Sequence, residues 1–182
     1  MNDKFLKEHL HECLRLEVMK SDKQFSWIRT IHKAIKCPER RFNFWWRIAS
    51  HLNRNGGKLN SKLARRINVK LQRKYSIDIG LEAWIGKGLK INHGFGIVVR
   101  NEFTAGDFLT LRQCTTIGKK KSGKSSGSIT IGSNVDIGAN VCILGDINIG
   151  DDVVIGAMSF INKDIPEGCT AYCLRSATLT FR

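Results

Sequence analysis

The chain has 182 residues, of which 42% are hydrophobic and 25% are charged, and its formal net charge is +14. This length and composition predict one globular domain with an appendage and exclude two full domains. No apolar run is long enough to span a bilayer, and the charged N-terminus lacks the apolar core of a secretory signal, so we expect a cytoplasmic protein.

Residues 1–76 form a basic region, with 19 lysines and arginines against 6 acidic residues. Apolar residues recur at helical spacing in FLKEHLHECLRLEVM, FNFWWRIASHL and KLNSKLARRINVKLQRKY, which predicts two or three helices. The aromatic cluster of Phe42, Phe44, Trp45 and Trp46 fits a core between helices or a stripe facing a membrane or partner. The charge alone allows nucleic acid, an anionic lipid surface or an acidic polymer as a partner.

The region from residue 77 to residue 168 repeats every six residues. Aliphatic residues fall at Ile79, Ile85, Ile91 and Ile97 and again at every sixth position from Ile131 to Ile161, and glycine follows many of them. A period of six fits neither a helix nor one continuous strand, but it fits a parallel β-helix of about four to five coils. Two breaks interrupt it: a slip of two residues between Ile97 and Ala105, and a loop at 119–128. Residues 169–182 form a C-terminal tail.

Only one histidine, His93, falls within the repeats. A single neutral imidazole can act as general base toward a hydroxyl, whereas a zinc enzyme of this fold needs several histidines, so we expect no metal. Asp78 lies fifteen residues before His93, nearly one coil, and is placed to orient its ring. The simpler alternatives are a structural histidine and an aspartate that caps the first coil. The six scattered cysteines form no CxxC pair and predict neither a zinc site nor a disulfide framework.

The pattern [IVL]-G-x-x-x-x resembles that of the left-handed β-helix acyltransferases. DIGLEAWIGKGLKINHGFGIVVRNE, residues 78–102, is similar to the catalytic core of their serine acetyltransferase branch. This resemblance implies an Asp78–His93 dyad, acetyl-CoA as co-substrate, and a homotrimer with active sites between subunits. A hexamer joined through the N-terminal helices is the larger alternative.

Two departures from the serine enzymes concern the amino-acid substrate. The chain has Asn92 where those enzymes have an aspartate, and Ser125 and Ser126 where they have Arg-His. Both changes remove charges that would bind an amino-acid zwitterion. Asn92-His93-Gly94 and the segments AGDF and GANVCILGD make the chain closer in character to capsule and colanic-acid acetyltransferases, and we assign Asn92 to acceptor binding.

The resemblance also implies a set of cofactor-binding residues. Ala139 and Ala157 would be small residues beside the pantetheine arm, Gly118 and Lys119 would begin a loop that offers a backbone N–H to the oxyanion, and Lys163 and Arg175 would lie near the phosphates. A plain turn residue of the β-helix is the alternative for the positions in the turns. Lys120 and Lys121 in the lysine-rich loop are assigned to an anionic acceptor, although a solvated loop explains them equally well. The tail TAYCLRSATLTFR lacks the glycine and proline with which the family usually closes over the nucleotide.

These inferences predict an acetyl-CoA-dependent O-acetyltransferase that acts on a hydroxyl of a bacterial surface polysaccharide by direct transfer. The first alternative is a serine O-acetyltransferase. The second is a non-enzymatic basic scaffold or nucleic-acid-binding protein, but no nucleic-acid-reading motif is present and we expect no nucleic acid. Peripheral attachment to the inner face of the membrane stays open.

Overall fold

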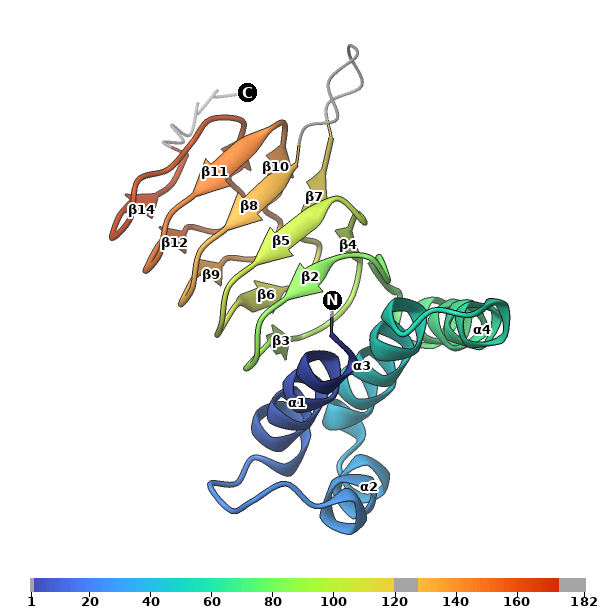
Figure 1. The fold of residues 1–182 in the computed structure, drawn as a ribbon. Helices are drawn as coiled ribbons and strands as arrows, with labels where there is room; N and C mark the ends of the chain where they lie inside the picture. Colours follow the sequence, from blue (N-terminus) through green and yellow to red (C-terminus); the bar gives the residue numbers. More distant parts are fainter. Residues whose placement is uncertain (1, 120–127, 174–182) are drawn as a thin grey trace, which may run out of the picture.

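A computed structural model describes residues 2–119 and 128–173. A helical region lies at one end of a β-solenoid (Figure 1). The region contains α1 (Asp3–Leu14), α2 (Trp27–Lys36), α3 (Arg41–Arg54) and α4 (Lys58–Tyr75). A π-helical turn, Arg15–Met19, extends α1, and a 3-10 turn, Pro38–Arg40, precedes α3. The Asn2 side chain caps α1 by accepting a hydrogen bond from the Lys4 amide at 3.1 Å.

The strands form three parallel sheets, and from β1 to β13 each strand pairs with the strand three places along the chain, while β14 pairs with β12. One coil of the solenoid therefore consists of three strands, one in each sheet. The sheets have the orders β1-β4-β7-β10-β13, β11-β8-β5-β2 and β14-β12-β9-β6-β3. This arrangement confirms the predicted fold class, a left-handed parallel β-helix preceded by helices. The strands are β1 (Ile77–Ile79), β2 (Trp84–Ile85), β3 (Lys90–Asn92), β4 (Ile97–Val99), β5 (Phe103–Ala105), β6 (Thr110–Arg112), β7 (Thr116–Gly118), β8 (Ile129–Ile131), β9 (Asp136–Ile137), β10 (Cys142–Leu144), β11 (Ile147–Ile149), β12 (Val154–Ile155), β13 (Phe160–Ile161) and β14 (Thr170–Ala171).

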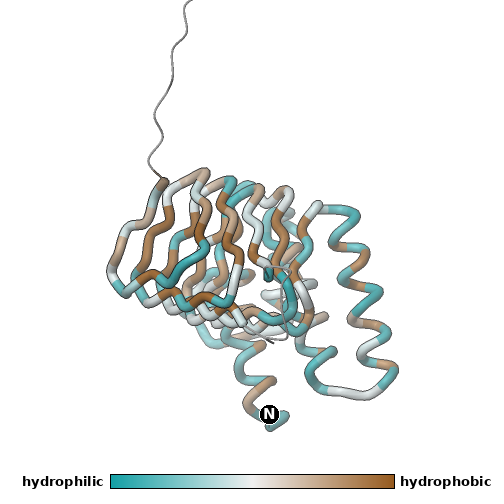
Figure 2. Tube along the Cα trace, turned by 90° about the horizontal axis from the view of Figure 1, so that it is seen from above, coloured by the Kyte–Doolittle hydropathy of each residue, from teal (hydrophilic) through white to brown (hydrophobic). Residues whose placement is uncertain are grey.

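The repeated aliphatic residues fill the solenoid interior. Figure 2 shows hydrophobic segments recurring from coil to coil. In the first sheet the buried stack runs through the paired residues Ile79, Val99, Ile117, Ile143 and Ile161. Each coil thus covers the apolar residues of the coil before it, as expected for a solenoid.

The position of the first break differs from the predicted one. Val99, and not Ile97, pairs with Ile79, so the two extra residues lie between Ile91 and Val99 and not after Ile97. Sequence spacing could not distinguish the two, because Ile97 and Val99 are both aliphatic and both point inward from β4. The insertion enlarges the turn that carries His93, in which His93 and Gly96 both have positive φ, at 51° and 64°.

The helix α3 covers the open edge of the first coil. An unpaired β-edge leaves backbone groups without partners, and side chains from α3 supply them here. The Trp46 indole donates to the Ile79 carbonyl at 3.1 Å, and the Arg47 guanidinium donates to the Ile85 and Gly86 carbonyls at 2.7 Å each. Phe42, Phe44 and Trp46 of the aromatic cluster are buried, as a core requires, while Trp45 is exposed.

Arg47 also forms a buried ion pair. Its Nη2 lies 2.6 Å from Glu17 Oε1, and both side chains are almost fully buried. Glu17 Oε1 in turn accepts a hydrogen bond from the Leu89 amide at 3.0 Å. The pair therefore joins the π-helical turn, α3 and the first coil into one network.

Candidate functional site

His93 lies in the enlarged turn between β3 and β4, at the junction of the helical region and the first coil. It lines a hollow of about 440 Å³ together with residues from both parts of the chain. Lys20 and Arg40 belong to the helical region, and Lys90 and Asn92 belong to β3. His93 itself is exposed, and no hydrogen bond or ion pair of its side chain occurs among the described residues. The imidazole is therefore accessible to a ligand in this hollow.

The strand that carries Asp78 runs beside the His93 turn. The Gly96 amide donates to the Ser76 carbonyl at 2.8 Å, and a methyl group on Gly94 would come within 2.7 Å of the Ile77 side chain. The structure thus brings the Asp78 strand and the His93 turn together. It does not show the predicted bond between their side chains, and the Asp78 carboxylate accepts a hydrogen bond from Gln72 Nε2 at 2.6 Å.

Sequence reasoning missed Gln72. It lies in the last turn of α4, six residues before Asp78. The sequence did contain a signal for it. The predicted helix ends directly before the first coil, so its last turn lies near the strand that carries Asp78. Gln72 is a neutral partner that can hold the Asp78 carboxylate in position while leaving its charge available.

Positive charge dominates the His93 hollow. Lys20, Arg40 and Lys90 line it. Glu17 is buried against Arg47, and Glu39 lies 3.3 Å from Arg40, so Lys20 and Lys90 are the cations of the described lining without an ion-pair partner. An anionic or neutral ligand therefore fits the described walls of the hollow better than a cation does.

The turns that connect the sheet containing β3 to the sheet containing β4 stack into a column, which begins at His93. The amides of Cys114, Asn140 and Met158 donate to the carbonyls of Phe95, Gln113 and Ala139 at 2.7, 3.0 and 2.7 Å. Ala139 and Ala157, two of the predicted cofactor residues, lie in this column. Their short side chains leave its backbone open to an extended ligand that ends near His93.

The other predicted cofactor residues lie at a different corner. Gly118 ends β7 and is followed by Lys119, and the exposed Lys163 follows β13. Both positions are on the far side of the first sheet from the His93 column, so the structure divides the predicted set between two corners. Arg175, Lys120 and Lys121 lie outside the described residues.

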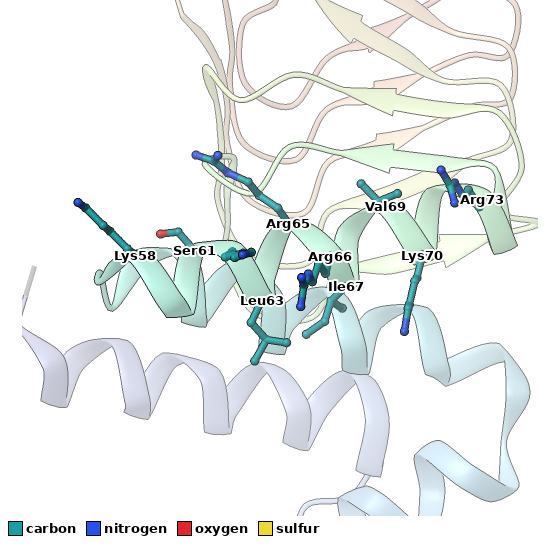
Figure 3. A pocket seen from close by; sticks show the side chains of 10 residues that line it. Lys58, Ser61, Leu63, Arg65, Arg66, Ile67, Val69, Lys70 and Arg73 are labelled. Atoms are coloured by element: carbon teal, nitrogen blue, oxygen red, sulfur yellow. The ribbon is translucent and has the colours of Figure 1, made fainter.

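A larger hollow, of about 1170 Å³, runs along α4. None of the predicted catalytic residues lines it. Figure 3 shows basic side chains projecting along the helix, and no acidic residue occurs in α4. The cations that line the hollow are Lys58, Lys62, Arg65, Arg66, Lys70 and Arg73.

Within residues 2–119 and 128–173, no three histidine, cysteine or acidic side chains are grouped as metal ligands. In the same part of the chain, no helix has the length and apolarity that crossing a bilayer requires.

Comparison with known proteins gives two kinds of match, although no family model matches the chain. It is 38% identical over 118 residues to a serine acetyltransferase of Helicobacter pylori, covering 65% of this chain and 69% of that protein. It is also 38% identical over 93 residues to the putative colanic acid biosynthesis acetyltransferase WcaB of Escherichia coli, covering 51% of this chain and 57% of that protein.

A solved structure confirms the likeness of fold. Serine acetyltransferase isoform 3 of Entamoeba histolytica, determined in complex with cysteine, superposes with a TM-score of 0.74 at 22% identity. The match covers 98% of this chain and 62% of that one, so the chain spans less than two thirds of the solved enzyme.

Proposed function

Because the chain belongs to the serine acetyltransferase-like family of β-helix acyltransferases, we propose that it transfers an acetyl group from acetyl-CoA to a hydroxyl. The observation that carries this proposal is the place of His93. It lies at the foot of the turn column, where an extended donor along the column meets an acceptor in the hollow.

In the proposed reaction the neutral His93 imidazole takes the proton of the acceptor hydroxyl as the oxygen attacks the thioester carbonyl. The carbon–sulfur bond then breaks, and the protonated imidazole returns the proton to the departing thiolate. No acetyl-enzyme forms. Asp78, held by Gln72, acts as a positioning residue that stabilises the imidazolium electrostatically. A backbone amide near Gly118 lies at the other corner of the first sheet, so it would reach the oxyanion of a His93 site only from a neighbouring subunit of the predicted homotrimer.

Two acceptors are supported by different observations. L-Serine is favoured by the comparisons, because the relative with the larger covered share is a serine acetyltransferase. A saccharide hydroxyl on an anionic surface polysaccharide is favoured by the uncharged Asn92 and by the surplus of cations in the hollow. The colanic acid relative points the same way. Both acceptors offer a hydroxyl to the thioester, so the proposed reaction is acetyl transfer to a hydroxyl.

We further propose a homotrimer, with a hexamer as the larger assembly, acting in the cytoplasm, where the donor acetyl-CoA is available. Apolar side chains on the flat outer faces of the solenoid support subunit association. Val98, Val154 and Phe160 are each at least 40% exposed on these faces.

The test measures release of the CoA thiol with L-serine and with acidic and neutral oligosaccharides as acceptors. His93→Ala should lower kcat by about 10²–10⁴ with the preferred acceptor. His32→Ala, which removes an exposed histidine from α2, is the matched control and should leave kcat unchanged. Full turnover by His93→Ala would exclude His93 as the base, and efficient turnover of serine alone would exclude the sugar acceptor.

A further inference from the structure

One face of α2 exposes a continuous apolar surface. Ile28 is 84% exposed and Ile35 is 66% exposed. The neighbouring side of the helix packs on the protein through the buried Thr30 and Ala34. We call the exposed face the apolar stripe, and its residues are Trp27, Ile28, Ile31 and Ile35, in which Ile31 follows Ile28 by three positions and Trp27 by four.

The side of α2 roughly opposite the apolar stripe is basic. Arg29, Lys33 and Lys36 lie there, and the helix contains no acidic residue. A hollow of about 270 Å³ opens along this side and is lined by Lys23, Arg29 and Lys33 among others. Its described lining includes no carboxylate, so an anionic group such as a lipid phosphate matches its charge.

A second copy of the chain would not match this surface. Residues 1–76 carry 19 basic residues against 6 acidic ones, and pairing two α2 faces would bring cations against cations. An apolar face with cations on the other face of the same helix is instead the pattern of a helix that lies in the plane of an anionic membrane surface.

We propose that α2 docks the protein on the surface of an anionic lipid bilayer, with the apolar stripe in the acyl boundary and the basic side at the headgroups. The helix packs on the two turns that bring Glu17 and Arg40 to the His93 hollow. Docking would therefore hold the hollow close to the lipid surface. If the proposed acetyl transfer is correct, this placement suits an acceptor that is itself attached to a lipid.

The experiment is flotation of the full chain with two kinds of vesicle, phosphatidylcholine alone and phosphatidylcholine with phosphatidylglycerol. The wild type should float with the anionic vesicles and much less with the neutral ones. Ile28→Asn with Ile35→Asn should lower partitioning about a hundredfold, because each buried isoleucine contributes about tenfold. Arg29→Gln with Lys33→Gln should lower it about tenfold or more.

The matched control is Leu59→Asn on α4, since Leu59 is 83% exposed and also lies in the helical region. It should float like the wild type. Equal loss by this control, or no flotation of the wild type, would overturn the proposal. So would a wild-type assembly that Ile28→Asn with Ile35→Asn splits into smaller species, because a second copy would then occupy the stripe. Acetylation of a soluble acceptor should be unchanged in these variants, which separates failure of docking from failure of the proposed activity.

Discussion

Replacement of Arg47 by methionine tests the network that covers the first coil. Arg47→Met leaves the Glu17 carboxylate buried without its partner, and removing one member of a buried ion pair typically destabilises a protein by about 3–5 kcal/mol. The backbone carbonyls of Ile85 and Gly86 lose their donor at the same time. With about 1 kcal/mol added for each of these two carbonyls, we expect a loss of about 5–7 kcal/mol in the free energy of unfolding.

The double variant Glu17→Met with Arg47→Met separates the cost of an unpaired buried charge from the cost of leaving backbone groups of the first coil without partners. Apolar replacement of a whole buried pair is often neutral or stabilising, by up to about 4 kcal/mol. Here it would still leave the Ile85 and Gly86 carbonyls and the Leu89 amide without partners. At about 1 kcal/mol for each such group, the low end of the usual range, the double variant should remain about 3 kcal/mol below the wild type.

Urea unfolding followed by circular dichroism, at one fixed protein concentration, measures these losses. The matched control is Arg112→Met, which breaks the half-exposed pair with Asp136 inside the solenoid and should cost below about 1 kcal/mol. A loss for Arg47→Met no larger than that of the control would refute the reasoning. Full recovery in the double variant would also refute it, because the backbone edge would then not depend on these side chains.

Two other variants test local features. Burial, and next the charge of Arg47, lowers the pKa of His9 to about 4. Since an unfolded histidine takes up its proton near pH 6.5, stability should be complete above that pH and fall as pH drops toward 4, by about 1 kcal/mol after allowance for solvent screening. His9→Phe, which keeps a ring stacked on Trp84, should flatten this part of a melting-temperature profile, and an unchanged slope would contradict the assignment. Gly138→Ala would put a methyl group 2.5 Å from the Ala157 amide nitrogen, so we expect a loss of about 1–3 kcal/mol in urea unfolding. In Gly118→Ala the added methyl group would have no neighbour nearer than 3.5 Å, so this variant should lose clearly less free energy of unfolding. Equal losses in the two variants would show that coil spacing does not depend on Gly138.

The hexapeptide period predicted the sheets and most of their register, because one aliphatic residue per strand is a local and repeated signal. It misplaced the break near His93, since Ile97 and Val99 satisfy the same pattern and only strand pairing separates them. The His93 hollow could not be predicted. Its walls join Lys20 and Arg40 to Lys90, residues brought together by packing between the helical region and the first coil.

The partner of Asp78 illustrates a second limit of the sequence. The spacing from Asp78 to His93 predicted a dyad, and that bond remains a prediction. Gln72, which holds the Asp78 carboxylate in the structure, depends on where the last turn of α4 ends relative to β1. A helix boundary that is uncertain by one or two residues turns this side chain toward another neighbour.

Because the His93 turn belongs to the first coil, which α3 covers, the number of coils beyond it can vary without disturbing the proposed base. Coils gained or lost at the far end would change the length of the turn column. They would therefore change how much of a long donor can contact the column. Selection could therefore adjust donor affinity and acceptor chemistry by separate changes, the first by gene duplication of an eighteen-residue unit and the second by substitution around one fixed turn.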